Sequence, residues 1–270
     1  MKLGINTVIL GGAELDEALG LVARCGYEFV ELSAIAGMKA HVNPGDDPSR
    51  IRDALASNNL AATAMEAATL DRERLRGLFK LASQIGVGIV NIGSGGATGD
   101  EESTVAAINL MREIAKDASD AGVTLAVKPH VGQAIHDGAT GLRLMHEVRG
   151  SVPEGAIGLN FDPSHLARAD EDPAQVAPLW GELIVTSHFR DCPVRVPGPP
   201  GTPQQQVPGR GALDLPAILS SLNSIGYAGP VNLEIIGAQE WPVAHSVALV
   251  AEARGYLRRC LQEVHNEVHN

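Results

Sequence analysis

The 270-residue chain is 44% hydrophobic and 20% charged, which is the composition of a globular protein and excludes a disordered one. Its formal net charge of −11 argues against nucleic-acid or anionic-lipid partners, because both are bound through basic surface. No uninterrupted apolar run reaches the roughly 20 residues that cross a bilayer, so no membrane partner is expected.

The three cysteines, Cys25, Cys192 and Cys260, are odd in number and widely spaced. They therefore predict neither a disulfide framework nor a zinc-binding array. Strand-like residues begin already at Leu3, so we expect no signal peptide. Together these features predict a cytoplasmic protein with reduced thiols.

Short apolar segments alternate with longer amphipathic segments along the chain, which is typical of a parallel sheet with crossover helices. Eight strand–helix units in a chain of this length favour a closed (β/α)8 TIM barrel over an open doubly wound sheet. We therefore predict an α/β protein with one barrel domain at 1–262 and a polar tail at 263–270. The predicted strands are 2–7, 29–33, 60–66, 89–93, 124–128, 157–162, 183–188 and 231–235. The predicted helices are 15–25, 48–58, 71–85, 101–121, 138–148, 172–180, 213–225 and 243–261.

Two loops are longer than the usual connections. Residues 94–100 are rich in glycine but lack the spacing of a nucleotide-binding motif, so we expect a flexible loop at the barrel mouth and no nucleotide cofactor. Residues 191–212 are rich in proline, glycine and glutamine and follow the seventh strand. Loops of this length are usually lids or binding loops, and this one is expected over the C-terminal face of the barrel.

The fifth to eighth predicted strands each have a titratable residue at or next to their C-terminal end: Lys128, Asp162, His188 and Glu234. The C-terminal ends of barrel strands open into one cup, so these side chains can meet although they lie far apart in sequence. Each alone fits a structural role, such as a helix cap, a buried ring or a salt bridge. Two carboxylates and an imidazole at three successive strand ends favour a divalent metal, namely Mn²⁺, Mg²⁺, Co²⁺ or Zn²⁺.

Several short motifs occur in a characteristic order along the chain. They are GYEFVEL (26–32), ASDAGV (118–123), NFDPSH (160–165), HFRD (188–191), PGRGALD (208–214) and VNLE (231–234). With these motifs the chain resembles the xylose isomerase-like barrels of sugar-phosphate isomerases and epimerases. The resemblance runs nearly from end to end, and it implies the fold but not the substrate.

The resemblance also implies roles for particular residues. Members of this family usually hold a metal with a glutamate, an aspartate, a histidine and a glutamate at the ends of strands five to eight. The last three positions match Asp162, His188 and Glu234, whereas Lys128 stands at the first. His130 and His165 match histidines beside the site, of which the second contacts substrate in relatives, and Glu31 matches a strand-two glutamate that we expect to be structural.

Lys128 puts a complete metal site in doubt, because an ammonium about 4 Å from a divalent ion costs roughly 8 kcal/mol at an effective dielectric of about 20. Three mechanisms stay open. A metal on Asp162, His188 and Glu234 can polarise the substrate while a base moves a proton. Without metal, Lys128 can stabilise an oxyanion while Glu234 is the base. A deprotonated Lys128 can also form a Schiff base with a keto-sugar.

Other residues near strand ends are candidates for substrate binding. Arg190 and Arg195 flank the exit of the seventh strand and can hold a carboxylate or phosphate, or can be solvated loop arginines. Glu66, at the end of the third strand, can meet a substrate hydroxyl. Trp241, after the eighth strand, can stack on the apolar face of a sugar or pack at the rim.

We expect an enzyme of carbohydrate metabolism, an isomerase or epimerase of a small sugar, keto-sugar or sugar acid that works through an enediolate. Glu234, Lys128 and His165 are its expected catalytic residues. The alternatives are a dehydratase or lyase of a cyclic polyol ketone, and a barrel that has lost catalysis but binds ligand. Abasic-site endonucleases of the same fold are disfavoured because they need a DNA-attracting surface. The expected partner is a small-molecule carbohydrate, and a homo-oligomer is possible.

Overall fold

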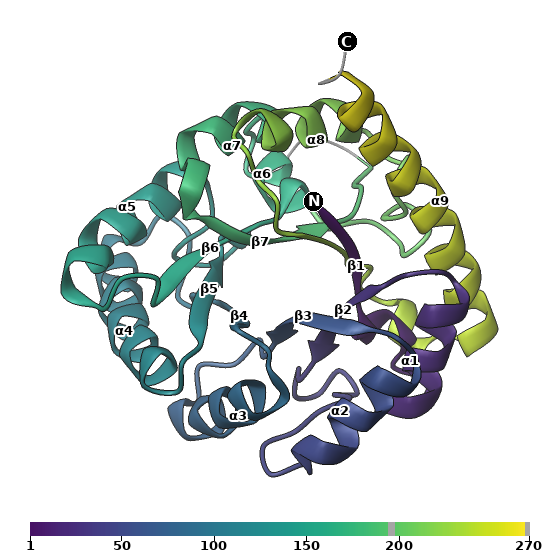
Figure 1. The fold of residues 1–270 in the computed structure, drawn as a ribbon. Helices are drawn as coiled ribbons and strands as arrows, with labels where there is room; N and C mark the ends of the chain where they lie inside the picture. The colour runs from purple at the N-terminus through teal and green to yellow at the C-terminus, as the bar shows by residue number, and fades with distance from the viewer. Residues whose placement is uncertain (194–197, 268–270) are drawn as a thin grey trace.

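Eight parallel strands form a closed barrel in the computed structural model, which describes residues 1–193 and 198–267 (Figure 1). Strand β1 pairs with β2 on one side and with β8 on the other, so the sheet has no free edge. The predicted (β/α)8 barrel is therefore confirmed. The strands are β1 (Lys2–Asn6), β2 (Phe29–Ser33), β3 (Ala61–Glu66), β4 (Ile89–Gly93), β5 (Thr124–Lys128), β6 (Ile157–Phe161), β7 (Ile184–Phe189) and β8 (Pro230–Leu233).

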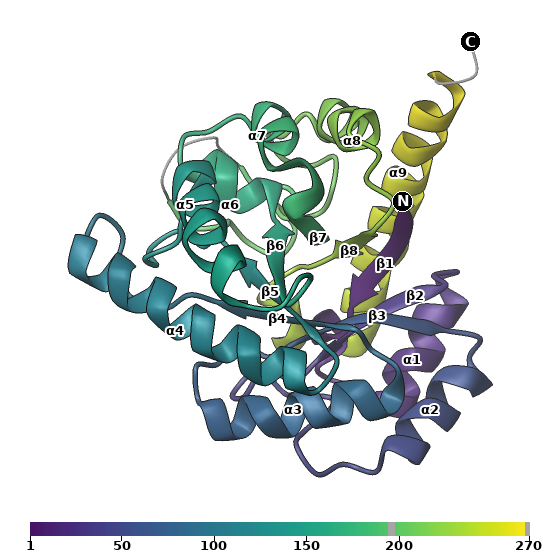
Figure 2. The ribbon, with the colours of Figure 1, turned by 60° about the vertical axis from the view of Figure 1, so that its left-hand side comes forward.

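Helices surround the strands, as Figure 2 shows from the side. Among the described residues, no helix is long and apolar enough to cross a bilayer. The α-helices are α1 (Leu15–Arg24), α2 (Pro48–Ser57), α3 (Arg72–Ile85), α4 (Glu101–Asp120), α5 (Gly138–Val148), α6 (Pro163–Arg168), α7 (Pro173–Trp180), α8 (Leu215–Ser224) and α9 (Val243–Glu267).

Two helices differ from the sequence prediction. The short helix α6 follows β6 directly, and α9 continues to Glu267 instead of ending at residue 261. Val264 is only 4% exposed and packs the end of α9 onto the core. The predicted polar tail therefore begins inside a helix, and its last residues, 268–270, lie outside the described ranges.

Aspartates begin seven of the helices. In each case the carboxylate accepts a hydrogen bond from a backbone N–H in the first turn, which satisfies a donor that has no partner within the helix. Asp162 does this for α6, so the residue directly after β6 already begins the next helix. The seven caps are Asp47, Asp71, Asp100, Asp137, Asp162, Asp172 and Asp214.

The barrel has an apolar layer outside its strands and a polar interior. Leu19, Leu78 and Leu219 are fully buried members of the layer between strands and helices. All eight strands contribute buried polar side chains. They include Asn6, Glu31, Asn91, Asn160 and Asn232. Such an interior can hold charged groups near its open end because polar partners are already present.

The loop after β7 lies against the barrel mouth and is fastened at two points. Asp191 Oδ1 accepts from the backbone N–H groups of Cys192 and Leu213, and Oδ2 accepts from Gly209. The Gln206 side chain donates to the carbonyl of Ile236 and accepts from its N–H, both at 2.9 Å. The described part of the loop is therefore a fixed wall of the mouth.

Candidate active site

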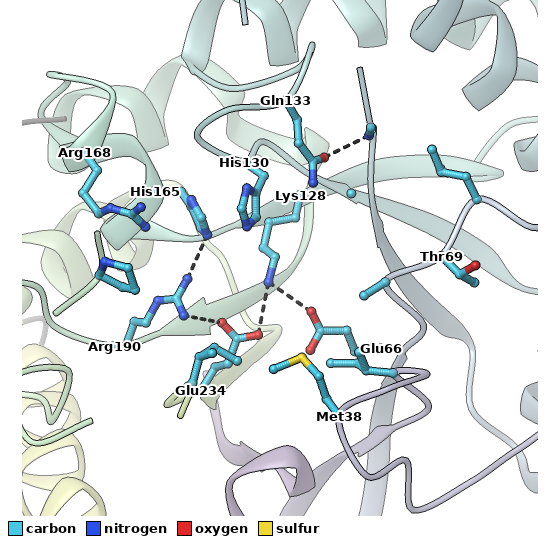
Figure 3. A pocket seen from close by; sticks show the side chains of 17 residues that line it. Met38, Glu66, Thr69, Lys128, His130, Gln133, His165, Arg168, Arg190 and Glu234 are labelled. Atoms are coloured by element: carbon cyan, nitrogen blue, oxygen red, sulfur yellow. Dashed lines mark hydrogen bonds and ion pairs between the residues drawn. The ribbon is translucent and has the colours of Figure 1, made fainter. Parts of the chain in front are cut away.

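The C-terminal strand ends enclose a cavity of about 380 Å³ (Figure 3). The sequence analysis named ten candidate site residues, and six of them line this cavity. Asp162 and His188 are almost fully buried behind the lining and bind residues that form it. The six lining residues are Glu66, Lys128, His130, His165, Arg190 and Glu234.

Lys128 lies at the centre of the site and is 6% exposed. Its Nζ is 3.0 Å from Glu66 Oε1, 3.0 Å from His188 Nδ1 and 3.1 Å from Glu234 Oε1. Burial alone would lower the pKa of Lys128, but the carboxylates of Glu234 and Glu66 outweigh burial and raise it. The side chain is therefore a fixed ammonium, which is a poor nucleophile for a Schiff base.

His188 connects Lys128 to the polar interior. Its Nε2 lies 2.5 Å from Glu31 Oε2, and Glu31 also accepts hydrogen bonds from Asn6 and Asn91. Burial alone would lower the pKa of His188, but the negative charges of Glu31, Glu234 and Glu66 prevail and raise it to about 10. Nε2 of His188 faces Glu31, and Nδ1 lies 3.0 Å from the Lys128 ammonium and 3.1 Å from Glu234 Oε1, so protein groups already occupy both ring nitrogens.

Arg190 is a second buried cation, 3% exposed, directly after β7. Its Nη2 donates to Asp162 Oδ2 at 3.3 Å, and its Nη1 forms an ion pair with Glu234 Oε2 at 3.0 Å. Burial would lower the pKa of Arg190, but Asp162 and Glu234 raise it. Arg190 is therefore neutralised inside the site, which leaves it little capacity for a substrate anion.

The residue types of a metal site are present. Two groups of side chains, Asp162–His188–Glu234 and Glu31–Glu66–His188, each bring three ligand atoms within 4.8 Å of one another. The ammonium of Lys128 and the guanidinium of Arg190, however, already bind the carboxylates of Glu66, Glu234 and Asp162. At about 4 Å each such cation repels a divalent ion by roughly 8 kcal/mol. With these side chains in place, the site does not fit a divalent metal.

The two carboxyl groups beside Lys128 differ in acidity. Burial raises the pKa of Glu66 to about 7, against the opposing charge of Lys128. Burial acts on Glu234 as well, but Lys128, His188 and Arg190 together hold the pKa of Glu234 well below its ordinary value. Glu66 can therefore exchange a proton near neutral pH, whereas Glu234 stays a carboxylate.

His130 and His165 pack against each other beside these charges, with ring centroids 3.9 Å apart and ring planes tilted by 39°. The Nδ1 of His130 lies 2.8 Å from the carbonyl oxygen of Val131, which only accepts, so Nδ1 carries the hydrogen and Nε2 has a lone pair. Burial and Lys128 lower the pKa of His130. His165 is more buried, and burial and Arg190 lower its pKa well below the ordinary value. Both rings are therefore neutral at neutral pH.

Two sequence candidates lie elsewhere. Trp241 does not line the cavity; it packs against the apolar core at the rim, because the chain turns into α9 directly after it. Arg195 lies outside the described residues. Sequence reasoning missed Arg168 and Gln133, which both line the cavity. Arg168 is five residues beyond Pro163 on α6, and only the NFDPSH motif before it offered a signal.

A closed parallel barrel with a polar cavity at its C-terminal strand ends is the architecture of the TIM-barrel enzymes. Comparison with family models defines the group further. Residues 19–260 match the model described as xylose isomerase-like TIM barrel, and the chain belongs to that family. The resemblance inferred from the sequence motifs is thereby confirmed.

A curated relative from Pseudomonas aeruginosa, named 3-dehydroshikimate dehydratase, is 25% identical over 245 residues. The match covers 87% of this chain and 38% of that protein, so the chain spans well under half the length of this relative.

Similar solved structures include an L-ribulose 3-epimerase, with a TM-score of 0.79 at 18% identity, covering 100% of this chain and 97% of that one. The IolI protein with a bound zinc atom has a TM-score of 0.77 at 19% identity, covering 98% and 99%. At such identities the structures establish the fold. The relatives and neighbours are enzymes, epimerases and a dehydratase among them, in agreement with the prediction of an enzyme.

Proposed function

We propose that this protein is an isomerase or epimerase of a small sugar, keto-sugar or sugar acid, which moves a proton next to the substrate carbonyl through an enediolate. Lys128 and Arg190 supply the positive charge that a divalent ion would otherwise supply. The observation that carries the proposal is Glu66, a buried carboxyl with a pKa near 7 that lines the cavity 3.0 Å from the Lys128 ammonium.

Glu66 is the proposed proton-transfer group. A general acid–base group works best when its pKa is close to the working pH, because it then both accepts and returns a proton. Glu234, the base expected from the sequence, is held ionised by three cations and is a weak base. Its proposed role is to fix Lys128 and Arg190 in position.

His130 is the proposed second proton-transfer group. Its neutral ring leaves Nε2 unprotonated, and the residue lines the same cavity as Glu66. Figure 3 shows the ring of His130 above the Lys128 ammonium and the carboxyl group of Glu66 below it. Two groups on different sides of the cavity can remove a proton at one position and deliver it at another, as isomerisation and epimerisation require.

The buried cations are proposed to stabilise the enediolate. Charges fixed in a site shielded from water stabilise a developing oxyanion without reorganising during the reaction. Lys128 and Arg190 meet that condition because each is held by carboxylates and is less than a tenth exposed. A cavity of about 380 Å³ is near the lower end of the usual ligand-pocket range and suits a small sugar.

Proton exchange in D₂O tests this proposal. D-fructose is one suitable ketone, since a related epimerase structure was obtained in its presence. Its C1-carboxylate analogue, 2-keto-D-gluconate, and an inosose complete the series. We expect deuterium to enter at the carbon next to the carbonyl of at least one of them, with exchange surviving EDTA. Absence of exchange in all three would contradict the proposal, and exchange abolished by EDTA and restored by metal would contradict the role of the cations.

A dehydratase is the second candidate, and the relationship to the 3-dehydroshikimate dehydratase across 87% of the chain favours it. Its reaction can begin with the same proton removal, after which a hydroxyl group leaves as water with the help of a general acid. Incubation with 3-dehydroshikimate separates the two candidates. A dehydratase forms a conjugated product with new ultraviolet absorbance. The product of an isomerase or epimerase has the same elemental composition as its substrate.

A further inference from the structure

Arg168 is a charged residue of the cavity wall that the proposed reaction does not use. It ends α6, is 7% exposed and lines the cavity. Its Nε donates to the carbonyl oxygen of Gly198 at 2.7 Å, which fixes the direction of the guanidinium. Within the described part of the chain, its two terminal nitrogens make no hydrogen bond or ion pair.

The other cavity cations are already neutralised. Lys128 is bound to Glu66 and Glu234, and Arg190 is bound to Glu234 and Asp162. Burial lowers the pKa of Arg168, the positive charge of Arg190 lowers it further, and the carboxylate of Asp162 opposes them only in part. A buried guanidinium that forms no ion pair with another described residue costs free energy, which an anion entering the cavity would recover.

We propose that Arg168 binds a carboxylate group of the substrate, so that the substrate is a polyhydroxylated keto-acid and not a neutral ketose. This inference rests on the proposed function and specifies its substrate class. Figure 3 shows Arg168 on the side of the cavity that holds His165 and Arg190. A carboxylate at Arg168 therefore lies on the opposite side of Lys128 from Glu66.

A carboxylate fits this position better than a phosphate does. One guanidinium neutralises one negative charge, and a carboxylate accepts two parallel hydrogen bonds from its two terminal nitrogens. A phosphate monoester carries close to two charges at neutral pH and would leave one of them uncompensated inside the protein. The carboxylate of Asp162, which already acts on the Arg168 guanidinium, increases that penalty.

Calorimetric binding to the full-length protein tests the assignment. The probes are 2-keto-D-gluconate, D-fructose and D-fructose 6-phosphate. The first two differ only at C1, which is a carboxylate in one and a hydroxymethyl group in the other. We expect the keto-acid to bind roughly 10- to 100-fold more tightly than D-fructose, as a hydrogen-bonded ion pair provides.

Arg168→Gln should reduce this preference to within about threefold. Glutamine keeps a donor for the carbonyl of Gly198, so the loop contact is preserved. Arg258→Met, which removes an exposed arginine on α9, is the matched control and should leave the preference unchanged. The assignment is overturned by equal binding of keto-acid and ketose, by a preference that survives Arg168→Gln, or by tighter binding of the phosphate.

Proton exchange, measured in parallel, separates this inference from the proposed function. Carboxylate-selective binding that depends on Arg168, without exchange in any probe, would refute the proposed reaction and support the anion site. Exchange that is equally fast with D-fructose and unaffected by Arg168→Gln would support the reaction and refute the anion site.

Discussion

Glu66 and Glu234 occupy the ends of β3 and β8 and accept from the same ammonium at nearly equal distances, 3.0 and 3.1 Å. Both are buried, yet the pKa of Glu66 is raised to about 7 and the pKa of Glu234 is held well below its ordinary value. The Glu234 carboxylate also contacts His188 and Arg190, whereas the second oxygen of Glu66 contacts the neutral Asn6. The number of adjacent cations, and not burial, therefore separates an acid–base group from a structural carboxylate.

The largest effect is expected when Lys128, the cation that Glu66 and Glu234 share, is removed. Lys128→Met leaves the carboxylates of Glu66 and Glu234 without their common partner, which should reduce the free energy of unfolding by roughly 3–5 kcal/mol. Proton exchange should fall by at least about 10³-fold. Urea denaturation and exchange rates measure both effects. Lys116→Met, which removes an exposed ion pair with Glu113, is the control and should change stability by less than about 1 kcal/mol. A fully stable and active Lys128→Met protein would contradict the assigned role.

Neutralising each glutamate in turn should distinguish the two strand ends. Glu234→Gln removes the charge that Lys128, His188 and Arg190 share, so a loss of roughly 3–5 kcal/mol is expected. Glu66→Gln should cost only about 1–2 kcal/mol but reduce exchange by about 10²- to 10⁴-fold. Glu252→Gln, at an exposed pair with Arg210, is the matched control. The reverse pattern, with Glu66 structural and Glu234 essential for exchange, would refute the assignment of the base.

The raised pKa of Glu66 predicts a pH dependence with a definite sign. Between pH 4.5 and about 7 the folded protein keeps a proton on Glu66 that the unfolded chain has released. The stability contributed by this group is therefore complete below pH 4.5 and is lost as the pH rises to about 7. The difference in unfolding free energy between wild type and Glu66→Gln should fall by on the order of 1–3 kcal/mol over this window.

Exchange that uses Glu66 as the base should rise with pH through the same region and level off above it. Denaturation curves and exchange rates at a series of pH values check the two trends. A stability difference that is constant with pH would mean that Glu66 has an ordinary carboxyl pKa.

The smallest effect is expected when Lys128 is replaced by a residue that can bind a metal. Lys128→Glu replaces the central cation by a carboxylate, which becomes a fourth candidate metal ligand beside Asp162, His188 and Glu234. We expect Mn²⁺ affinity, measured by calorimetry, to increase by at least about tenfold over wild type, limited by the remaining charge of Arg190. Lys128→Met is the control for removing charge without adding a ligand. No gain in affinity would contradict the view that Lys128 blocks the metal.

The sequence by itself determined the barrel, because short apolar segments alternate with longer amphipathic ones, and glycines and aspartates mark the helix ends. These patterns depend on local preferences for strand, helix and cap. It also located the strand ends that carry Lys128, Asp162, His188 and Glu234, since strand ends follow from the same local pattern. The motif resemblance identified the family from the order of those segments.

Only the tertiary structure decided how these residues share charge. It paired Lys128 with Glu66, 62 residues away, and directed Arg190 to Asp162 and Glu234, so that among the described residues of the cavity wall Arg168 is the guanidinium without an ion pair. It also placed Trp241 at the rim and fastened the loop after β7. A pKa or an ion pair depends on distances between groups that the sequence pattern does not specify, and barrel closure sets those distances.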